Sequence, residues 1–355
     1  MIRRPPRSTR KESSAASDVY KRQKSDKYTL LINKGKIMQI SGGVQLSGGV
    51  NLVPGSGSPS PSPGPSFQGS NFGYTSGGSA SSNKLNTIDK FSFSSDSNAS
   101  DVGDLTGNKS SLAGHSSADN GYTSAGFSPT VFVSTIDKFP FSSDGNASDV
   151  GDVSVARYEV IGQSSSNHGY TTGGEGPGYF NTIEKFPFAS DGNASDVGDL
   201  TQGTAAGSGQ SSTSSGYYSG GTVSAQTNKI EKFSFSSDGN GSDVGDLTES
   251  KYLLTGQSSA DNGYVSGGSV AGVGLLNTIE KFPFASDDNA TDVGDLTSTR
   301  NRVTGQSSTA SGYTSGGRSP SLVNTIEKFP FASDGNATDV GDLTVARGEA
   351  AGQQY

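Results

Sequence analysis

Cysteine is absent from this chain of 355 residues, and tryptophan is absent as well. Without a thiol, the chain can form no disulfide framework, no thiol nucleophile and no cysteine-ligated zinc site. No run of about 18 apolar residues occurs, so the sequence predicts no membrane-spanning helix. Histidine is nearly absent: His115 and His168 have no evident partners, and we expect both to be solvated loop side chains rather than bases.

The apolar stretch of a targeting peptide is missing from residues 1–23, although they are rich in basic side chains. This segment contains the strings MIRRPPRST and SSAASDVYKRQ, which are what two sequencing-adapter DNA sequences encode in frame. We therefore interpret residues 1–23 as an adapter-derived artefact, and we expect native residues before position 24 to be missing.

Positive charge is scarce in the rest of the chain. Residues 1–23 hold seven Lys and Arg and two Asp and Glu, whereas the whole chain holds 26 and 34. The remainder therefore has 19 basic and 32 acidic side chains and a net charge of −13. A surface of this sign repels the phosphates of nucleic acids, so we expect no nucleic-acid partner.

The dominant feature of the sequence is a unit that occurs six times with a period of 47 to 49 residues. The phenylalanine of a Lys-Phe pair marks each copy, at Phe91, Phe139, Phe186, Phe233, Phe282 and Phe329. Disordered tracts do not keep apolar residues in fixed register over many copies. A period of about 40–50 residues with several strand-like pieces per unit is typical of β-propellers.

Each unit contains four pieces that read as short strands. In the last unit these pieces are Thr304–Ser308, Gly312–Gly317, Asn324–Phe331 and Thr338–Thr344. We therefore predict four-stranded blades. Proline occupies the middle of the Phe-x-Phe sequence in four copies. Because proline cannot donate to a ladder, we expect that end of the third strand to be frayed or bulged.

Both faces of the third strand carry apolar side chains. Positions i and i+2 of a strand share a face, so Phe329 and Phe331 point one way and Ile326 points the other. A blade sandwiched between two other blades needs this pattern. Burying five such side chains contributes about 10 kcal/mol per unit, which is less than the chain entropy lost on ordering about 47 residues. One copy alone should not fold, and each copy should supply the wall against which its neighbour packs.

The repeat region begins and ends partway through a unit. It starts at a second strand, in FGYTSGG (Phe72–Gly78), and stops after a first strand, in AGQQY (Ala351–Tyr355). Six copies of each strand are then present, so the last strand can complete the first blade. The sequence thus predicts an all-β, six-bladed β-propeller that is closed noncovalently by its C-terminal strand, and we expect the C-terminus to be intact.

The predicted organisation has three parts after residue 23. Residues 24–53 alternate apolar and polar side chains with Gly turns, which predicts a small β-rich anchor or assembly segment. Residues 54–66, PGSGSPSPSPGPS, have the composition of a linker. Residues 67–355 form the predicted propeller.

Three motifs of the unit carry a resemblance to a known family. A glycine pair closes the second strand, as in GYVSGG (Gly263–Gly268), the strand IEKF follows, and Arg157 and Arg347 follow fourth strands. In these features the unit resembles kelch-type propeller repeats, which implies a fold more than a function. It lacks the tryptophan expected before the fourth strand, and Ala125 interrupts one glycine pair. The string SGGVQLSGGVNLV and the 47-residue period are also similar to repeat proteins of environmental phages.

The connections between strands differ in how much they vary. In an antiparallel blade, the first–second and third–fourth turns lie on one face, and the second–third and fourth–first connections lie on the other. The first set is nearly constant across the six units, whereas the second set varies freely. Binding surfaces are commonly built from variable loops on a rigid scaffold, although drift in unconstrained loops gives the same pattern. The aromatic and basic members of the variable set are our candidate contact residues: Phe132, Tyr158, Tyr179, Phe180, Tyr252, Arg300 and Arg302.

The third–fourth turn, SDGNAT in the last unit, is rich in Asp, Asn, Gly and Ser in every copy. The simplest interpretation is a hairpin turn whose side chains satisfy backbone N–H groups. Calcium binding by Asp334, Asp339 and Asp342 is a second interpretation, although no known ligand loop matches. A third is N-glycosylation in a secreted eukaryotic protein, because every copy holds an Asn-x-Ser/Thr triplet, at Asn98, Asn146, Asn193, Asn240, Asn289 and Asn336.

No catalytic set of residues is evident in the sequence. The acids recur symmetrically, which suits a structural role, and no Ser-His-Asp set, phosphate loop or dinucleotide fingerprint occurs. We expect a non-enzymatic, cofactor-free structural or recognition protein of a virion or extracellular assembly. Residues 24–53 would dock to other assembly proteins or to further copies, and the propeller would bind a host-surface glycan or protein. A cellular kelch-like scaffold for protein partners is the alternative, and a glycan-cleaving propeller enzyme is a third.

Overall fold

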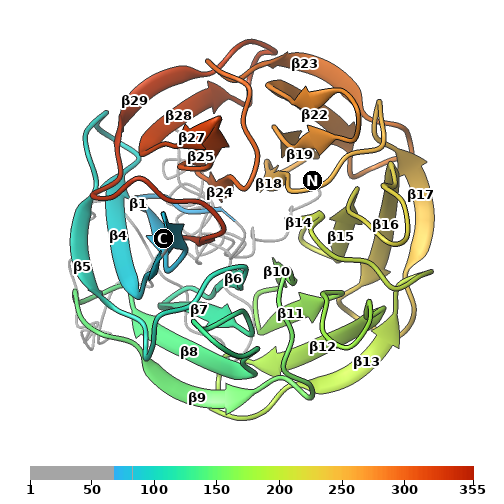
Figure 1. Ribbon diagram of the computed structural model, residues 1–355. Helices are drawn as coiled ribbons and strands as arrows, with labels where there is room; N and C mark the ends of the chain where they lie inside the picture. Colours follow the sequence, from blue (N-terminus) through green and yellow to red (C-terminus); the bar gives the residue numbers. More distant parts are fainter. Residues whose placement is uncertain (1–67, 82) are drawn as a thin grey trace, which may run out of the picture. The chain divides into compact units, whose positions relative to one another are not determined.

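The computed structural model describes residues 68–81 and 83–355, which belong to one compact unit spanning residues 59–355. The predicted segments 1–23, 24–53 and 54–66 lie outside the described residues. Within the described part, every regular element is a β-strand, and no helix there is a candidate for crossing a membrane. Six antiparallel sheets of four strands each form a closed ring (Figure 1), which confirms the predicted six-bladed β-propeller.

Each blade runs from an innermost first strand to an outermost fourth strand (Figure 1). Blade 1 contains β30 (Ala351–Gln354), β1 (Phe72–Ser76), β4 (Thr87–Ser92) and β5 (Ser100–Asp104). Blade 2 contains β6 (Ala113–Ser116), β7 (Asn120–Ser124), β8 (Thr135–Pro140) and β9 (Ser148–Asp152). Blade 3 contains β10 (Ile161–Ser164), β11 (His168–Thr172), β12 (Thr182–Pro187) and β13 (Ser195–Asp199).

The other half of the ring repeats this order. Blade 4 contains β14 (Ser208–Ser211), β15 (Ser215–Ser219), β16 (Lys229–Ser234) and β17 (Ser242–Asp246). Blade 5 contains β18 (Thr255–Ser258), β19 (Asn262–Ser266), β22 (Thr278–Pro283) and β23 (Thr291–Asp295). Blade 6 contains β24 (Thr304–Ser307), β25 (Ser311–Ser315), β28 (Thr325–Pro330) and β29 (Thr338–Asp342), close to the four pieces predicted for it.

Three second–third connections fold into small hairpins that the sequence did not predict. They are β2 (Ser79–Ala80) with β3 (Asn83–Lys84) in blade 1, β20 (Ser269–Val270) with β21 (Gly274–Leu275) in blade 5, and β26 (Arg318–Ser319) with β27 (Ser321–Leu322) in blade 6. These connections differ in sequence, so no repeated pattern signals the pairing.

The C-terminal strand closes the ring as predicted. Strand β30 pairs antiparallel with β1, with Tyr74 opposite Gln353 and Ser76 opposite Ala351. The pairing extends beyond the strands, because the N–H of Tyr355 donates to the carbonyl of Phe72 at 2.8 Å, and the N–H of Phe72 donates back at 2.8 Å. The first blade is therefore assembled from both ends of the repeat region.

The two faces of each third strand pack on different neighbours, which confirms the predicted directions of the side chains. In blade 6, Ile326 packs with Phe91 and Phe93 of blade 1, whereas Phe329 packs with Tyr264 of blade 5. At all six junctions, the tyrosine of a second strand contacts both rings of the next blade's Phe-x-Phe pair. Rings at these separations attract each other beyond their burial alone.

The proline end of the third strand, predicted to be frayed or bulged, contains no bulge, and the one register shift of the strand lies nearer its start. The register of β28 against β29 shifts between Ile326 and Glu327, whereas Pro330 is the regular last residue of β28 and lies opposite Ser311 of β25. The proline sits beyond the last pair with β29, Lys328 with Thr338, so its missing N–H interrupts no ladder on that side. Of the two predicted alternatives, the strand end is thus frayed on the side of the fourth strand, because that ladder ends before Pro330, and no bulge occurs at the proline.

Candidate recognition face

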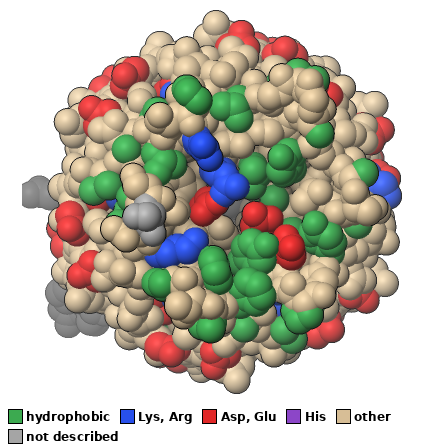
Figure 2. Space-filling model, in the orientation of Figure 1, with side chains coloured by type: hydrophobic (Ala, Val, Ile, Leu, Met, Phe, Trp, Pro, Cys, Tyr) green, Lys and Arg blue, Asp and Glu red, His purple; other side chains and the backbone are tan. Residues whose placement is uncertain are grey.

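The two faces of the ring differ in chemistry. We call the face formed by the second–third and fourth–first connections the variable face, and the opposite one the repeated face. Within the described residues, every exposed large hydrophobic side chain lies on a variable-face connection: Val131, Phe132, Val155, Tyr179, Val273 and Val345. Figure 2 shows hydrophobic, basic and acidic side chains gathered around a hollow at the centre of this face. Apolar groups exposed on one face favour an interaction surface there.

The repeated face is built from the same interblade contacts six times. The lysine of each third strand forms an ion pair with an aspartate in the next blade's third–fourth turn, as Lys281 does with Asp334. The asparagine of each Asn-x-Ser/Thr triplet accepts a hydrogen bond through Oδ1 from a backbone N–H of the preceding blade, as Asn336 does from Asp295 at 3.0 Å. These turns therefore join blades, in addition to shaping their own hairpins.

The other two interpretations of this turn remain predictions. All six triplet asparagines are exposed, so glycosylation of Asn98, Asn146, Asn193, Asn240, Asn289 and Asn336 stays open. Of the candidate calcium ligands, Asp334 is paired with Lys281, and Asp339 accepts the N–H of Gly341 at 3.1 Å. Within residues 68–81 and 83–355, no three His, Asp or Glu side chains are grouped as metal ligands.

A closed ring of main-chain hydrogen bonds surrounds the axis on the variable face. One residue of each fourth–first connection has a left-handed backbone with φ between 51° and 60°, and its N–H donates to the carbonyl of the equivalent residue of the preceding blade at 2.7–3.1 Å. We call these residues the axial ring: Ser111, Glu159, Ala206, Leu253, Arg302 and Glu349. Their backbone geometry is constant, whereas their side chains are almost all different.

An aromatic cluster lies on one side of the axial ring. Phe132, 37% exposed, stacks on Tyr158 with ring centroids 5.0 Å apart, and Phe127 lies 5.6 Å from Phe132. Tyr179 of the next connection is 41% exposed, and Glu175 is bridged through its backbone to both Tyr158 and Tyr179. The structure thus brings three of the predicted contact residues, Phe132, Tyr158 and Tyr179, into neighbouring positions.

Two acids border this aromatic cluster without an ion pair to any described residue, Glu159 and Glu175. Burial raises the pKa of Glu159, and the charge of Glu175 raises it further. Burial also raises the pKa of Tyr158, as does its hydrogen bond to Glu175. This side of the axial ring therefore combines aromatic rings with negative charge.

The remaining predicted contact residues lie apart from the cluster. The ring of Phe180 is half-buried beneath the Arg157 guanidinium, 5.2 Å away, and Tyr252 is half-buried on the blade 5 connection. Arg300 is only 1% exposed and forms an ion pair with Glu327. Arg300 therefore cannot reach a ligand on this face, and we correct its role to a structural one.

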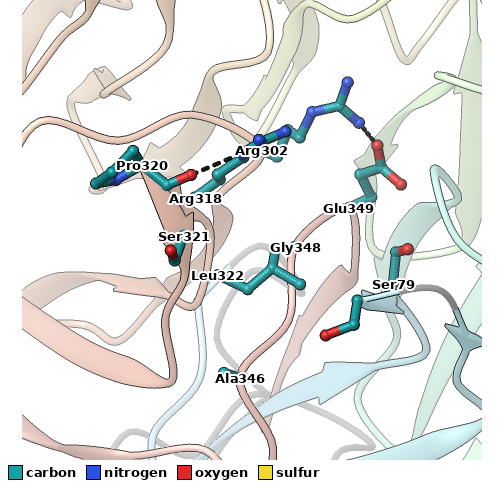
Figure 3. Close-up of a pocket in the computed structure, with 10 residues that line it drawn as sticks. Ser79, Arg302, Arg318, Pro320, Ser321, Leu322, Ala346, Gly348 and Glu349 are labelled. Atoms are coloured by element: carbon teal, nitrogen blue, oxygen red, sulfur yellow. Dashed lines mark hydrogen bonds and ion pairs between the residues drawn. The ribbon is translucent and has the colours of Figure 1, made fainter.

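A groove of about 580 Å³ opens on the variable face between blades 6 and 1. We call it the seam groove, and its walls include Ser79, Arg302, Arg318, Ser321, Leu322 and Glu349. Figure 3 shows Arg302 paired with Glu349, and Arg318 bonded to the carbonyl of Pro320. Of these residues, only Arg302 was a predicted contact residue; Arg318 lies in the variable string RSPSLV and could have been chosen by the same rule.

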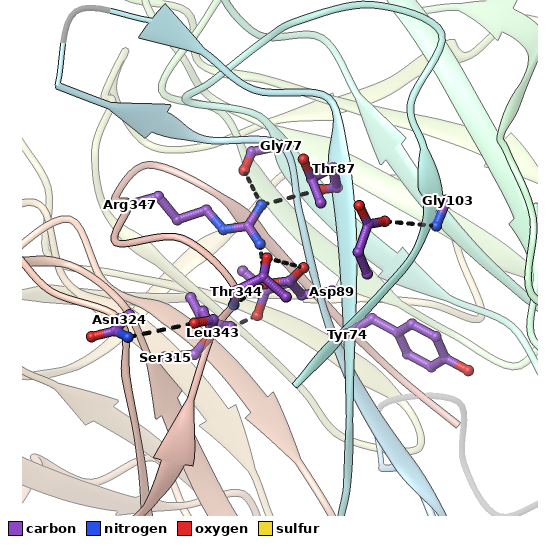
Figure 4. A network of polar contacts seen from close by, with 12 residues as sticks. Tyr74, Gly77, Thr87, Asp89, Gly103, Ser315, Asn324, Leu343, Thr344 and Arg347 are labelled. Atoms are coloured by element: carbon purple, nitrogen blue, oxygen red, sulfur yellow. Dashed lines mark hydrogen bonds and ion pairs between the residues drawn. The ribbon is translucent and has the colours of Figure 1, made fainter. Parts of the chain in front are cut away.

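Beneath the variable face, the acid of each third strand is buried and bound by the connection that arrives from the preceding blade. Asp89 accepts the N–H of Thr344 at 2.8 Å and pairs with Arg347, which also donates to the carbonyl of Gly77 at 3.0 Å (Figure 4). The other such pairs are Lys109 with Asp137, Arg157 with Glu184, Lys251 with Glu280, and Arg300 with Glu327. The kelch-like arginines Arg157 and Arg347 are thus interblade contacts.

Blade 4 departs from this pattern. Its acid, Glu231, is 2% exposed and is bonded by the N–H of Thr201 at 2.7 Å, but Thr204 stands where the other connections carry Lys or Arg. The hydroxyl of Tyr218 lies 3.5 Å from the Thr204 hydroxyl and accepts the N–H of Gly207 at 3.2 Å. A Cβ on Gly207 would lie 2.5 Å from the Tyr218 ring. In blade 4, Tyr218, Thr204 and Gly207 together therefore take the place of the Lys or Arg that the other blades place beside the buried acid.

His115 is not the solvated loop residue that the sequence suggested. It lies in the innermost strand β6, is 1% exposed, and occupies the position that holds Gln in the other five blades. Its Nδ1 lies 3.2 Å from the carbonyl of Gln163 and its Nε2 lies 2.8 Å from the Ser124 hydroxyl. Burial lowers the pKa of His115 to about 4, so this histidine is neutral at pH 7.

These features define the class of protein: a closed six-bladed β-propeller repeat protein with one variable face. The architecture is consistent with the kelch-like repeat that the glycine pairs indicated. A scan against models of known protein families finds no match to this chain, and no curated protein matches it. The similarity to phage repeat proteins remains a prediction.

Proposed function

We propose that this protein is a non-enzymatic recognition module that binds a ligand on a surface through its variable face. One observation carries the proposal: the exposed apolar side chains and the seam groove lie on that face, whereas the repeated face uses its polar side chains in six equivalent contacts between blades. A rigid ring with unlike loops on one side is a common basis for binding.

The finer proposal places this module in a virion or another extracellular assembly. Gly69 pairs with Ser308 in the first–second turn of blade 6, on the repeated face. The similarity of the repeated unit to repeat proteins of environmental phages supports this context. Electron microscopy of native source material tests the context: particles or filaments that contain the protein support an assembly, and a soluble monomer contradicts it.

Binding to arrays of glycans and of cell-surface proteins tests the recognition role. The double variant Phe132→Ser/Tyr179→Ser removes the two most exposed aromatic rings of the cluster, and we expect at least a tenfold weaker signal with an unchanged melting temperature. Ser333→Ala, an exposed position on the repeated face, is the matched control and should bind like the parent protein. Absence of any ligand on both arrays, or loss of binding through Ser333→Ala instead, would contradict the proposal.

A cellular kelch-like scaffold for protein partners is the second candidate. The Phe132–Tyr158 stack favours it, because aromatic side chains are enriched at protein interfaces. Selective binding to proteins, with no glycan bound, would support this candidate over the first.

A further inference from the structure

We propose that the seam groove binds a carboxylated saccharide, with Arg318 as the residue that holds the carboxylate. This inference rests on the proposed recognition function and names its ligand class. The groove lies above the closure of the ring: Ser79 comes from the blade 1 hairpin, and Arg318 and Ser321 come from the blade 6 hairpin. Its volume of about 580 Å³ is in the usual range for small-ligand sites.

The charge of the groove is opposite to that of the protein. Arg302 and Arg318 both line it, and Glu349 is the single acid among the lining residues. Lys84 lies alongside: its Nζ donates to the Ser110 hydroxyl at 2.6 Å, and that hydroxyl donates to Glu349 at 3.2 Å. The residues that line the groove carry two cations and one anion, a local charge of +1 on a chain that is strongly acidic. A local excess of positive charge attracts an anionic ligand.

The cations lie close enough to repel each other, and a bound anion would reduce that repulsion. Burial and then the charge of Arg302 lower the pKa of Lys84, so these two cations disfavour each other. Arg302 is already neutralised by its ion pair with Glu349. Of the arginines in the groove, Arg318 is thus the one whose charge no described side chain compensates.

Arg318 is oriented for a planar anion. Its Nε donates to the carbonyl of Pro320 at 2.8 Å, within the same hairpin, which holds the guanidinium in place (Figure 3). The two terminal nitrogens have no hydrogen bond to a described residue, and a guanidinium presents such a pair of donors to a carboxylate in a bidentate fashion.

The rest of the wall favours a sugar over a peptide or a nucleic acid. Ser79, Ser81 and Ser321 line the groove and offer hydroxyls that both donate and accept, as the hydroxyls of a saccharide require. A peptide would need deeper apolar pockets for its side chains. Leu322 is the one large aliphatic side chain among the lining residues, and the exposed aromatic side chains of this face lie in the cluster around Phe132. A nucleic acid would need cations spaced along its successive phosphates, whereas two arginines line this groove.

Titration of the full chain with uronic-acid oligosaccharides tests this inference. The probes are tetramers of galacturonate, glucuronate and guluronate, each compared with the neutral tetramer obtained by reducing its carboxyl groups. We expect at least one acidic tetramer to bind, its reduced counterpart to bind at least tenfold more weakly, and Arg318→Gln to lose at least tenfold in affinity with an unchanged melting temperature. Glu349→Gln frees Arg302, so it should tighten binding about three- to tenfold, a gain that damage to the fold cannot produce.

Several outcomes would overturn the inference. They are equal binding of acidic and reduced tetramers, normal affinity in Arg318→Gln, no binding of any acidic tetramer, and tighter binding of a tetra-aspartate peptide than of any sugar. Phe132→Ser separates this inference from the proposed function. If array ligands depend on Phe132 and not on Arg318, the variable face still recognises a ligand but the seam groove is not the saccharide site.

Discussion

At the residue scale, His115 is a titratable group in a position where five blades carry a neutral amide. Its neighbours are the Ser124 hydroxyl, the carbonyl of Gln163 and the Phe186 ring, which is perpendicular to the imidazole with ring centroids 5.0 Å apart. None of these compensates a positive charge as a carboxylate would, so protonation is opposed by burial.

We predict that the stability of the propeller falls between about pH 6.5 and pH 4 because of His115. The pKa is about 4 in the folded protein and near 6.5 when unfolded, so the unfolded chain takes up the proton first. The contribution of the neutral, buried His115 to the free energy of unfolding is fully present above about pH 6.5, and about 3 kcal/mol of it is lost by pH 4. Denaturant melts of the parent and of His115→Gln across this range measure it.

The His115→Gln variant carries the residue that the other five blades have at this position, so we expect the substitution to preserve the structure of the blade. The carboxylates titrate in both proteins and cancel in the difference. A difference in unfolding free energy that stays constant from pH 7 to pH 4 would contradict the prediction.

Two glycines of blade 6 provide a matched test of packing. A Cβ on Gly312 would lie 2.3 Å from Cζ of Phe329, which is buried against blade 5, whereas a Cβ on Gly335 would meet nothing within 4 Å. We expect Gly312→Ala to cost about 3 kcal/mol, and Gly335→Ala to stay within about 0.5 kcal/mol. Thermal melts of the two variants measure the difference. Equal losses of stability would contradict the prediction and show that the Phe329 side chain can move away from an added methyl group.

The direction of the third-strand side chains could be read from the sequence, but their burial could not. Alternation places Glu327 on the same face as Phe329, toward blade 5, and there it meets Arg300. Taken alone, however, the Glu-Lys pair in an Ile-Glu-Lys-Phe string predicts two solvated side chains of opposite charge. The acid is buried because an eight-residue connection from the preceding blade covers it, and no local sequence pattern encodes that cover.

At the scale of the element, blade 4 tests whether the buried contacts act as a set. We predict that Tyr218→Val alone costs about 3 kcal/mol, because it empties the site beside Glu231 and leaves the Gly207 N–H without its acceptor. Adding Thr204→Lys and Gly207→Leu copies the blade 5 set of Lys251, Leu254 and Val265. The triple variant should return to within about 1 kcal/mol of the parent.

The non-additivity is the measured quantity in this series. Unfolding free energies of the single, double and triple variants give the coupling between the three sites. If the three changes simply add, then Thr204, Gly207 and Tyr218 are independent substitutions rather than a replacement for the cation.

Elements follow from the sequence where they repeat and not where they differ. The predicted Thr338–Thr344 strand is β29, Thr338–Asp342, because six copies constrain the same ladder. The hairpin β26–β27 was missed since its string occurs once, and the seam groove was missed with it. The seam groove therefore lies in connections that do not repeat, and the period of the sequence cannot predict their structure.

At the scale of the whole molecule, stability depends on closure by β30. We predict that deletion of residues 351–355 leaves the edge of β1 unpaired and removes the hydrogen bond from Gln353 to the carbonyl of Tyr122, and that the melting temperature falls by more than about 10 °C. Calorimetry and size-exclusion chromatography measure the loss and any edge-to-edge association.

A circular permutant is the control for closure. Tyr355 and Gly69 are adjacent, so a short Gly-Ser linker can join residue 355 to residue 68, with new termini at the exposed tip of the blade 5 hairpin around Val273. This protein keeps every strand and should melt close to the parent. If the truncated chain melts like the parent, the noncovalent seam contributes nothing to stability.

In the axial ring, the backbone maintains the structure and the side chains are free to vary, whereas in most binding sites the same groups serve both purposes. Its six amides and six carbonyls satisfy one another, and a left-handed backbone at each position is enforced by that circle of bonds whatever the side chain is. Serine, glutamate, alanine, leucine and arginine already occupy equivalent places around one opening. The propeller is thus suited to randomisation: a combinatorial library at these six positions would vary ligand specificity while the framework that displays it stays the same.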